Sequence, residues 1–336
     1  MRILFSSYAF SPSVGGIESV SATLAAEFTR AGHEIQLVTE TSSDDALRWP
    51  FPVFRRPTAG KLWQATRWCD VALHNNISLS LGWPLLAVRR PWVIAHQTWI
   101  SRPNGTISGL DRLKTALLRC ATNIAISEAI ATALPVNSAV IGNPYDAGSF
   151  KRMPDIERSK DLIFVGRLVS DKGVDLLLEA LAALQQEGLR PELTIVGNGP
   201  EEESLRGLAE RLGIAEQVTF SGTKRGDGLV RELNRHRVLV VPSRWKEPFG
   251  VVALEGIACG CVVVGSTGGG LPDAIGPCGL TFPSGEPLAL AAVLHRVLTD
   301  EALCAGLLQN AAFHLEAHRP DRVAGQYLKI LEAAVR

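Results

Sequence analysis

The sequence predicts an α/β protein built from two doubly wound, Rossmann-like domains, and three observations lead to this fold class. Short apolar runs alternate with amphipathic stretches along the chain, which is typical of repeated βα units around a parallel sheet. A polar segment with two prolines, at 142–160, interrupts this series once, and the series then starts again. The length of 336 residues suits two domains better than one core.

The first series of βα units starts at the N-terminus and predicts a first domain over residues 1–145. A strand at Ile3–Phe5 precedes a helical pattern from about Gly16 to Ala31, which Gly32 ends as a C-cap. Ser127 caps a later helix, with Glu128 in its first turn. The other predicted strands are Ile35–Thr39, Val71–Leu73, Trp92–Ala95 and Thr122–Ile126.

A predicted linker at 146–160 separates this domain from a second one at 161–317. The strands expected there are Leu162–Val165, Leu193–Val196, Val218–Phe220, Val238–Val241 and Val262–Val264. The last helical pattern, at 318–336, follows the final strand, and we expect it to pack back on the first domain. Two such domains place a cleft between the carboxyl ends of their sheets, where these folds bind ligands.

The bulk composition excludes several classes of protein. Basic and acidic residues number 34 each, so net charge does not favour a nucleic-acid partner. Residues 1–145 hold 13 basic and 9 acidic residues, which favours contact with an anionic membrane or acceptor, although scattered solvated charge is the alternative. No apolar run reaches ~18 residues and no signal-peptide pattern is present, so we expect a cytoplasmic chain. The six cysteines form neither a disulfide framework nor a zinc pattern.

The segment Glu247–Glu255 carries the main chemical signal. It follows a buried strand, and a helix is expected to begin near Gly250, so unpaired N–H groups at the helix start would suit a phosphate. Glu247 lies in the loop and Glu255 lies about a turn and a half into the helix. Two such carboxylates would grip different hydroxyls of one long ligand. Taken alone, an exposed acidic pair explains the pattern equally well.

Two cations follow the first strand of the second domain. Arg167 and Lys172 lie five residues apart in Gly166-Arg-Leu-Val-Ser-Asp-Lys-Gly173, before a helix. A rigid guanidinium and a mobile ammonium suit a pyrophosphate, and they would stabilise the charge that develops when a sugar–phosphate bond breaks. Solvated loop charges are the alternative reading of this segment.

Other polar or glycine-rich loops follow predicted strands at the same sheet edges. In the second domain they contain Gly199, then Thr223 with Lys224, and finally Asp273; their backbone groups would hold a base and a diphosphate. In the first domain the Val14–Glu18 loop contains Gly16, and His96 ends another strand. The chain lacks a G-x-G-x-x-G fingerprint, a G-x-S-x-G elbow, a P-loop and an Asp-x-Asp metal clamp.

Taken together and in order, these motifs resemble family 4 retaining glycosyltransferases of the GT-B fold, over nearly the whole chain. The resemblance implies that Glu247 contacts the donor sugar, that Glu255 holds the ribose, and that Arg167 and Lys172 bind the diphosphate. It implies that Gly16 lies in a mobile loop and that His96 lines the sugar site. It also implies that the segment Phe249, Gly250, Val251 and Val252 surrounds the sugar and phosphates.

The resemblance further implies retention of configuration, no metal and no cofactor. The expected function is transfer of a hexose-type sugar from a UDP- or GDP-sugar to a hydroxyl of a glycan, lipid-linked or other acceptor, in cell-envelope or exopolysaccharide synthesis. A non-catalytic nucleotide-sugar-binding protein and a GT-B epimerase or hydrolase are the alternatives. Asp273 stands where the family often has Glu, and the loops Arg48–Arg67 and Trp99–Leu110 match no known acceptor pattern.

Overall fold

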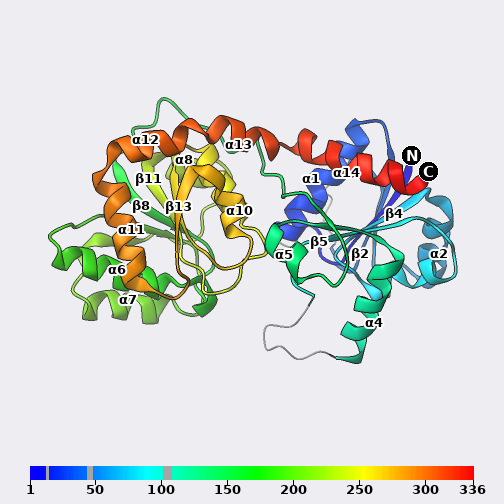
Figure 1. Cartoon of the computed structure of the whole chain (residues 1–336), viewed down its shortest axis with the longest axis horizontal. Coiled ribbons are helices and arrows are strands. Elements are labelled where there is room, and N and C mark those ends of the chain that lie inside the picture. The colour runs from blue at the N-terminus through cyan, green and yellow to red at the C-terminus, as the bar shows by residue number, and fades with distance from the viewer. Residues whose placement is uncertain (13–14, 44–47, 101–107) are drawn as a thin grey trace. The chain divides into compact units, whose positions relative to one another are not determined.

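The chain folds into two compact units in a computed structural model that describes residues 1–12, 15–43, 48–100 and 108–336. Unit 1 comprises Met1–Pro144 together with His318–Arg336, and unit 2 comprises Tyr145–Ala317 (Figure 1). Val14 of the predicted glycine loop and residues 101–107 of the loop without a known acceptor pattern lie outside the described residues.

The described residues of unit 1 form a seven-stranded, wholly parallel sheet in the order β3-β2-β1-β4-β5-β6-β7. The strands are β1 (Arg2–Ser7), β2 (Glu34–Thr39), β3 (Val53–Arg55), β4 (Val71–Asn75), β5 (Trp92–His96), β6 (Thr122–Ala125) and β7 (Ala139–Val140). The chain moves outward from β1 in one direction and then returns to continue from β4 in the other. The order reverses between β1 and β4, as in a doubly wound fold.

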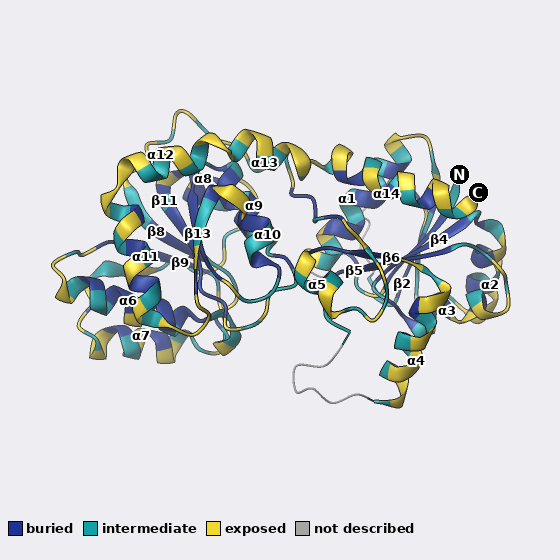
Figure 2. Ribbon diagram, viewed as in Figure 1, coloured by how far each residue is buried: buried dark blue, intermediate teal, exposed yellow. Residues whose placement is uncertain are grey.

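Apolar side chains alternate between the two faces of this sheet, and helices cover both faces. The helices are α1 (Gly16–Arg30), α2 (Ala59–Trp68), α3 (Leu79–Gly82), α4 (Gly109–Leu117), α5 (Glu128–Ala133) and α14 (Pro320–Val335). Phe5 shares one buried cluster with Leu24 of α1, whereas Leu4 shares another with Leu62 of α2. The strands are accordingly buried between exposed outer helix faces (Figure 2).

Unit 2 repeats this arrangement. Its described strands are also all parallel, in the order β10-β9-β8-β11-β12-β13. They are β8 (Lys160–Val165), β9 (Leu193–Val196), β10 (Val218–Phe220), β11 (His236–Val241), β12 (Val262–Ser266) and β13 (Gly279–Phe282). The order reverses between β8 and β11. The two parallel α/β units confirm the predicted fold class.

The helices of unit 2 pack on its sheet through long runs of buried aliphatic residues. They are α6 (Val174–Gln186), α7 (Glu202–Arg211), α8 (Asp227–Arg235), α9 (Val251–Ala258), α10 (Leu271–Ile275), α11 (Pro287–Thr299), α12 (Glu301–Gln309) and α13 (Ala311–Ala317). The main core joins Phe164 of β8 to Leu177 of α6 and Leu294 of α11. Gly256 of α9 lies against the other face, where a Cβ would come within 2.4 Å of the Leu239 side chain.

The segment expected to be a linker, 146–160, differs from that prediction, because it belongs to unit 2. The backbone N–H of Met153 donates to the Asn234 side chain at 2.7 Å, and the Arg158 guanidinium donates to the carbonyl oxygen of His236. The segment is polar because its backbone and side chains form hydrogen bonds with the rest of unit 2.

Three edge strands, β3, β7 and β13, were not predicted. They are short, and β3 and β7 have no buried residue. An edge strand has a neighbouring strand on one side only, and a short one buries few residues. Such strands need no continuous apolar run, so the apolar pattern that predicts the other strands is missing.

The C-terminal helix α14 completes the core of unit 1. It packs beside α1, where the rings of Phe28 and Tyr327 lie 6.5 Å apart (Figure 1). Tyr327 and Leu331 are fully buried in the same cluster as Phe5. The core of unit 1 therefore contains residues from both the N-terminal and the C-terminal part of the chain.

We expect Leu331→Ala to destabilise unit 1 by about 2–5 kcal/mol, because it removes a buried side chain and leaves a cavity. Urea unfolding followed by the tryptophans of unit 1 measures this change. Lys329→Ala, two residues away at an exposed position, serves as the control and should change stability by less than about 0.5 kcal/mol. Equal effects of both substitutions would contradict the burial of Leu331 in the core of unit 1.

Candidate functional site

The loops that follow β8 and β11 lie at the topological switch point of unit 2. These two strands are neighbours, but the chain leaves them toward opposite ends of the sheet. Ligands of doubly wound sheets bind outside the carboxyl ends of the strands at such a point. The loop after β8 contains Arg167 and Lys172, and the loop after β11 contains Glu247. The sequence-predicted groups thus meet where this fold class binds ligands.

Lys172 and Glu247 are in direct contact. The Lys172 Nζ donates to Glu247 Oε1 at 2.6 Å, and the Ser243 hydroxyl donates to the same oxygen at 2.8 Å. Ser243 is buried, while the ion pair keeps limited access to solvent. The other oxygen, Oε2, makes no hydrogen bond with the described residues. Glu247 is thus held through one oxygen, and the second stays available to a ligand hydroxyl.

Backbone contacts that only glycine permits hold these loops together. Gly173 has φ +67°, and a Cβ there would lie 2.1 Å from the Pro242 carbonyl oxygen. The backbone N–H groups of Arg244 and Trp245 both donate to the Asp171 carbonyl. The loops after β8 and β11 therefore pack directly against each other.

A third loop, which follows β12, fixes the backbone of Glu247. The Gly270 N–H donates to the Glu247 carbonyl at 2.7 Å. Gly269 has φ +76°, and a Cβ there would come within 2.2 Å of that carbonyl oxygen. The glycines that the sequence placed before Asp273 thus position the carboxylate, and Asp273 itself lies in the first turn of α10.

Helix α9 begins directly after this loop. Gly250 is its N-cap with φ 110°, and no side chain caps the helix. Phe249 is buried, and Val251 and Val252 are partly exposed. An N-terminus without a side-chain cap presents backbone N–H groups and the positive end of the helix dipole, which suit a phosphate.

Glu255 lies on α9. It remains partly exposed, yet burial of its carboxyl group, together with the charge of Asp146, raises the pKa of Glu255 to about 7. The ionised form is thus costly in the folded protein until a partner offers hydrogen bonds. A ligand hydroxyl that donates to this carboxylate would offset that cost.

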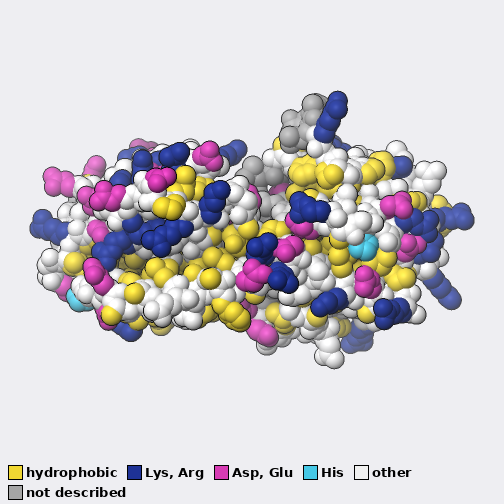
Figure 3. All heavy atoms as spheres, turned by 90° about the horizontal axis from the view of Figure 1, so that it is seen from above, with side chains coloured by type: hydrophobic (Ala, Val, Ile, Leu, Met, Phe, Trp, Pro, Cys, Tyr) yellow, Lys and Arg dark blue, Asp and Glu magenta, His cyan; other side chains and the backbone are white. Residues whose placement is uncertain are grey.

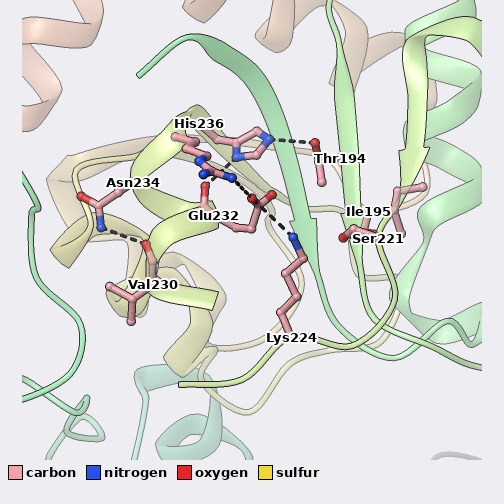
Figure 4. A network of polar contacts seen from close by, with 9 residues as sticks. Thr194, Ile195, Ser221, Lys224, Val230, Glu232, Asn234 and His236 are labelled. Carbon is pink, nitrogen blue, oxygen red and sulfur yellow. Dashed lines mark hydrogen bonds and ion pairs between the residues drawn. The ribbon is translucent and has the colours of Figure 1, made fainter. Parts of the chain in front are cut away.

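Arg167 and Lys224, the other predicted cations, differ in their surroundings. Arg167 is exposed, and its guanidinium makes no hydrogen bond or ion pair within the described part of the chain. Lys224 instead lies 3.4 Å from the buried Glu232, which also accepts from Arg235 at 2.9 Å (Figure 4). His236, beside this pair, bonds Thr194 at 2.9 Å. Lys224 therefore compensates a buried carboxylate, whereas Arg167 is open to a ligand.

The remaining predicted donor residues of unit 2 lie in loops after β9 and β10. Gly199 packs on the loop after β8, since a Cβ would lie 2.1 Å from the Leu168 carbonyl oxygen. Thr223 is exposed next to Lys224. In this structure, close packing accounts for Gly199, and Thr223 has no observed contact that indicates a ligand.

Unit 1 contains its own cavity at the equivalent sheet edge. A cavity of about 490 Å³ lies at the carboxyl ends of β1, β4 and β5 and is lined by His96, Asn75, Thr98 and Lys114 among others. The His96 Nε2 lies 2.9 Å from Asn123 Oδ1, and burial lowers the pKa of His96. Gly16, at the start of α1, is exposed with open space around it.

Sequence reasoning missed Ser243, Asn123 and Asn75 of β4. Each is a buried polar residue in or directly after an apolar strand, which was the one available signal. Such a residue is informative only when its partner is known: Ser243 bonds Glu247 within the same loop, and Asn123 bonds His96 of another strand. His96 belongs to unit 1 and Glu247 to unit 2.

Comparisons with known proteins relate unit 2 to glycosyltransferases. Residues 149–313 match the family described as glycosyl transferases group 1. This part of the chain belongs to that family. D-inositol 3-phosphate glycosyltransferases from Streptomyces bingchenggensis and Acidothermus cellulolyticus are 35% identical over 185 residues and 38% over 177. These matches cover 52% and 49% of this chain, and 40% and 39% of the two relatives. The chain thus spans about two fifths of the length of these relatives.

Solved structures extend the likeness of the fold beyond the group 1 domain. Anabaena Alr3699/HepE in complex with UDP has a TM-score of 0.84 at 22% identity, covering 99% of this chain and 100% of that one. Sucrose-phosphate synthase from Thermosynechococcus elongatus has a TM-score of 0.79 at 22% identity, covering 99% of both chains. These structures confirm the GT-B fold class.

We expect Glu255→Gln to stabilise the free protein at pH 8 and to have little effect near pH 4. The raised pKa means that the folded state holds a proton that the unfolded state has lost between about pH 4.5 and 7. Stability from this group therefore falls as pH rises through that window, by about 1–3 kcal/mol in total. Urea unfolding of both proteins at pH 4, 6 and 8 measures the difference. A pH-independent effect would contradict the desolvation of Glu255.

Proposed function

We propose that this chain transfers a hexose-type sugar from a UDP- or GDP-sugar to a hydroxyl of a glycan, lipid-linked or other acceptor. The observation that carries the proposal is the arrangement at the β8–β11 switch point of a group 1 domain. There, Arg167 has no partner among the described residues, Lys172 contacts Glu247, and the N-terminus of α9 has no side-chain cap. These groups suit a diphosphate with a sugar beside it. Anabaena HepE, of similar fold, was solved with UDP-glucose.

In the proposed reaction the bond between the sugar C1 and the donor diphosphate oxygen breaks. A new bond forms between C1 and the acceptor oxygen, and the acceptor proton passes to the departing diphosphate. Arg167, Lys172 and the α9 N–H groups stabilise the negative charge that develops there, without need of a metal ion. Glu247 Oε2 accepts from a sugar hydroxyl, and Glu255 accepts from the ribose. Retention of configuration, through attack on the same face, is part of this proposal.

Product analysis by NMR tests the proposal. The protein is incubated with UDP-glucose or GDP-mannose and a set of hydroxyl acceptors, and the new linkage and its anomeric configuration are determined. An acceptor-dependent product with the donor's configuration is expected. An inverted product refutes retention, while free sugar or an epimer formed without acceptor indicates a hydrolase or epimerase. Binding without any product indicates a non-catalytic nucleotide-sugar-binding protein.

We expect Arg167→Ala to lower turnover by about 10²–10³-fold, because it removes a cation from the departing diphosphate. Thermal stability should stay nearly unchanged, since this guanidinium has no partner among the described residues. Arg190→Ala is the matched control: Arg190 is also exposed but precedes β9, at the opposite edge of the sheet. Steady-state kinetics at saturating donor measure the change. Equal turnover of the two variants would remove Arg167 from the mechanism.

Contact with an anionic membrane is a further part of this proposal and rests on α4. This helix has no buried residue, and it exposes Leu110 and Leu113 beside Arg112 and Lys114 (Figure 2). Over the face of the molecule in Figure 3, by contrast, basic and acidic side chains are mixed. No helix in the described ranges combines the length and hydropathy needed to span a bilayer. Contact through α4 would therefore be peripheral, in synthesis of the cell envelope or an exopolysaccharide at a cytoplasmic surface.

Flotation with liposomes tests this contact. The protein should float with vesicles that contain phosphatidylglycerol and not with phosphatidylcholine alone, and the double substitution Leu110→Ser, Leu113→Ser should reduce flotation at least threefold. Leu288→Ser, at a residue that is 73% exposed in unit 2, is the matched control and should float as the parent does. Flotation that does not depend on the anionic lipid, or that the double substitution leaves unchanged, would exclude α4 as the contact.

A further inference from the structure

Asn123 of β6 holds a fixed orientation that determines the chemistry of its neighbour His96. The side chain is buried, with only 5% of its surface exposed. Its Nδ2 donates one hydrogen bond to the Leu118 carbonyl and one to the Ala121 carbonyl, both at 2.9 Å. A primary amide has two N–H hydrogens, so both are used. Rotating the amide by 180° would lose both bonds and place its oxygen against two carbonyl oxygens.

The Asn123 Oδ1 must therefore face His96, and it lies 2.9 Å from the His96 Nε2. An amide oxygen accepts hydrogen bonds and cannot donate them, so the Nε2 carries the proton. Burial lowers the pKa of His96, which keeps the ring neutral at neutral pH. A neutral imidazole has one ring proton, and the Nδ1 is left with a free lone pair.

This free nitrogen belongs to a side chain that lines the cavity of unit 1. Asn76, Thr98 and Lys114 are among the other lining residues, and the Nδ1 makes no hydrogen bond with any described residue. His74, on the neighbouring strand β4, shows the contrast. It is fully buried, and neither of its ring nitrogens has a partner in the described structure. The fold thus orients one histidine at the cavity and leaves the other as part of the core.

We infer that Asn123 is a positioning residue that locks His96 in the Nε2–H tautomer, so that the cavity presents the Nδ1 as a hydrogen-bond acceptor. The group that fits this nitrogen is a hydroxyl, which donates a proton, as in a sugar or polyol. An unprotonated phosphate or carboxylate oxygen would meet a lone pair and be repelled, so any anionic part of the ligand lies elsewhere. Lys114 is the one cation among the described residues that line the cavity. The ligand assignment rests on the proposed function, whereas the tautomer does not.

Long-range ¹H–¹⁵N correlation NMR of the whole protein labelled with ¹⁵N-histidine tests the tautomer directly. The His96 signals are assigned by their loss in His96→Gln. At pH 7.5 the ring should be neutral with its proton on the Nε2. A proton on the Nδ1, a charged ring or a mixture of tautomers would overturn the inference, and no variant of Asn123 has to fold for this result.

Substitutions then separate positioning from packing. Asn123→Leu removes the acceptor, so both tautomers of His96 should appear, and turnover should fall about tenfold, as for loss of one hydrogen bond. Asn234→Leu is the matched control, because Asn234 is also buried, donates to two carbonyls and accepts one N–H, in unit 2. A single Nε2–H tautomer in Asn123→Leu, or an altered one in Asn234→Leu, would overturn the assignment.

Titration of the labelled protein with UDP-glucose, GDP-mannose and free hexoses tests the ligand. The His96 Nδ1 resonance should shift toward the value of a hydrogen-bonded acceptor with at least one of them. No shift with any of them overturns the hydroxyl role. A shift without sugar transfer supports the inference and refutes the proposed function, so the two failures remain distinguishable.

Discussion

Close backbone contact between the loops at the carboxyl edge of the unit 2 sheet is the constraint on which the candidate donor site depends. Gly173 lies against Pro242, and Gly269 lies against Glu247, at separations that leave no room for a Cβ. Any side chain at these glycines would push apart the loops after β8, β11 and β12. The contact between Lys172 and Glu247 would then be lost, since the two residues come from different loops.

At this edge of the sheet, two glutamates, Glu247 and Glu255, have different properties because their surroundings differ. Glu247 is held by Lys172 and Ser243 through a single oxygen, so its geometry is set before any ligand arrives. Glu255 lies on α9 with Asp146 as its charged neighbour, and desolvation raises its pKa to about 7. The first carboxylate is therefore suited to orient a hydroxyl, and the second would gain stability from a group that donates hydrogen bonds to it.

In unit 1, neutral groups rather than charged ones hold a candidate site residue in place. Asn123 makes three hydrogen bonds, two from its Nδ2 and one at its Oδ1, and these determine which nitrogen of His96 carries the ring proton. A buried amide with both N–H groups and its oxygen hydrogen-bonded is a rigid support. Lys224 shows the opposite case, since its interaction with the buried Glu232 directs it toward the protein rather than toward a ligand.

The sequence by itself determined the parallel α/β architecture, because strands buried on both faces read as continuous apolar runs. It also placed Arg167, Lys172 and Glu247 at strand ends, which suffices to bring them to one sheet edge; their roles stay predictions. Only the tertiary structure decided that Ser243 supports Glu247, that Lys224 compensates Glu232, that Asn123 orients His96, and that residues 146–160 belong to unit 2. The contacts of Asn123 with His96 and of Met153 with Asn234 join segments that are far apart in the sequence, whereas the pairs Ser243–Glu247 and Lys224–Glu232 depend on how one short segment folds. Local patterns of apolar and polar residues contain no information about either kind of pair.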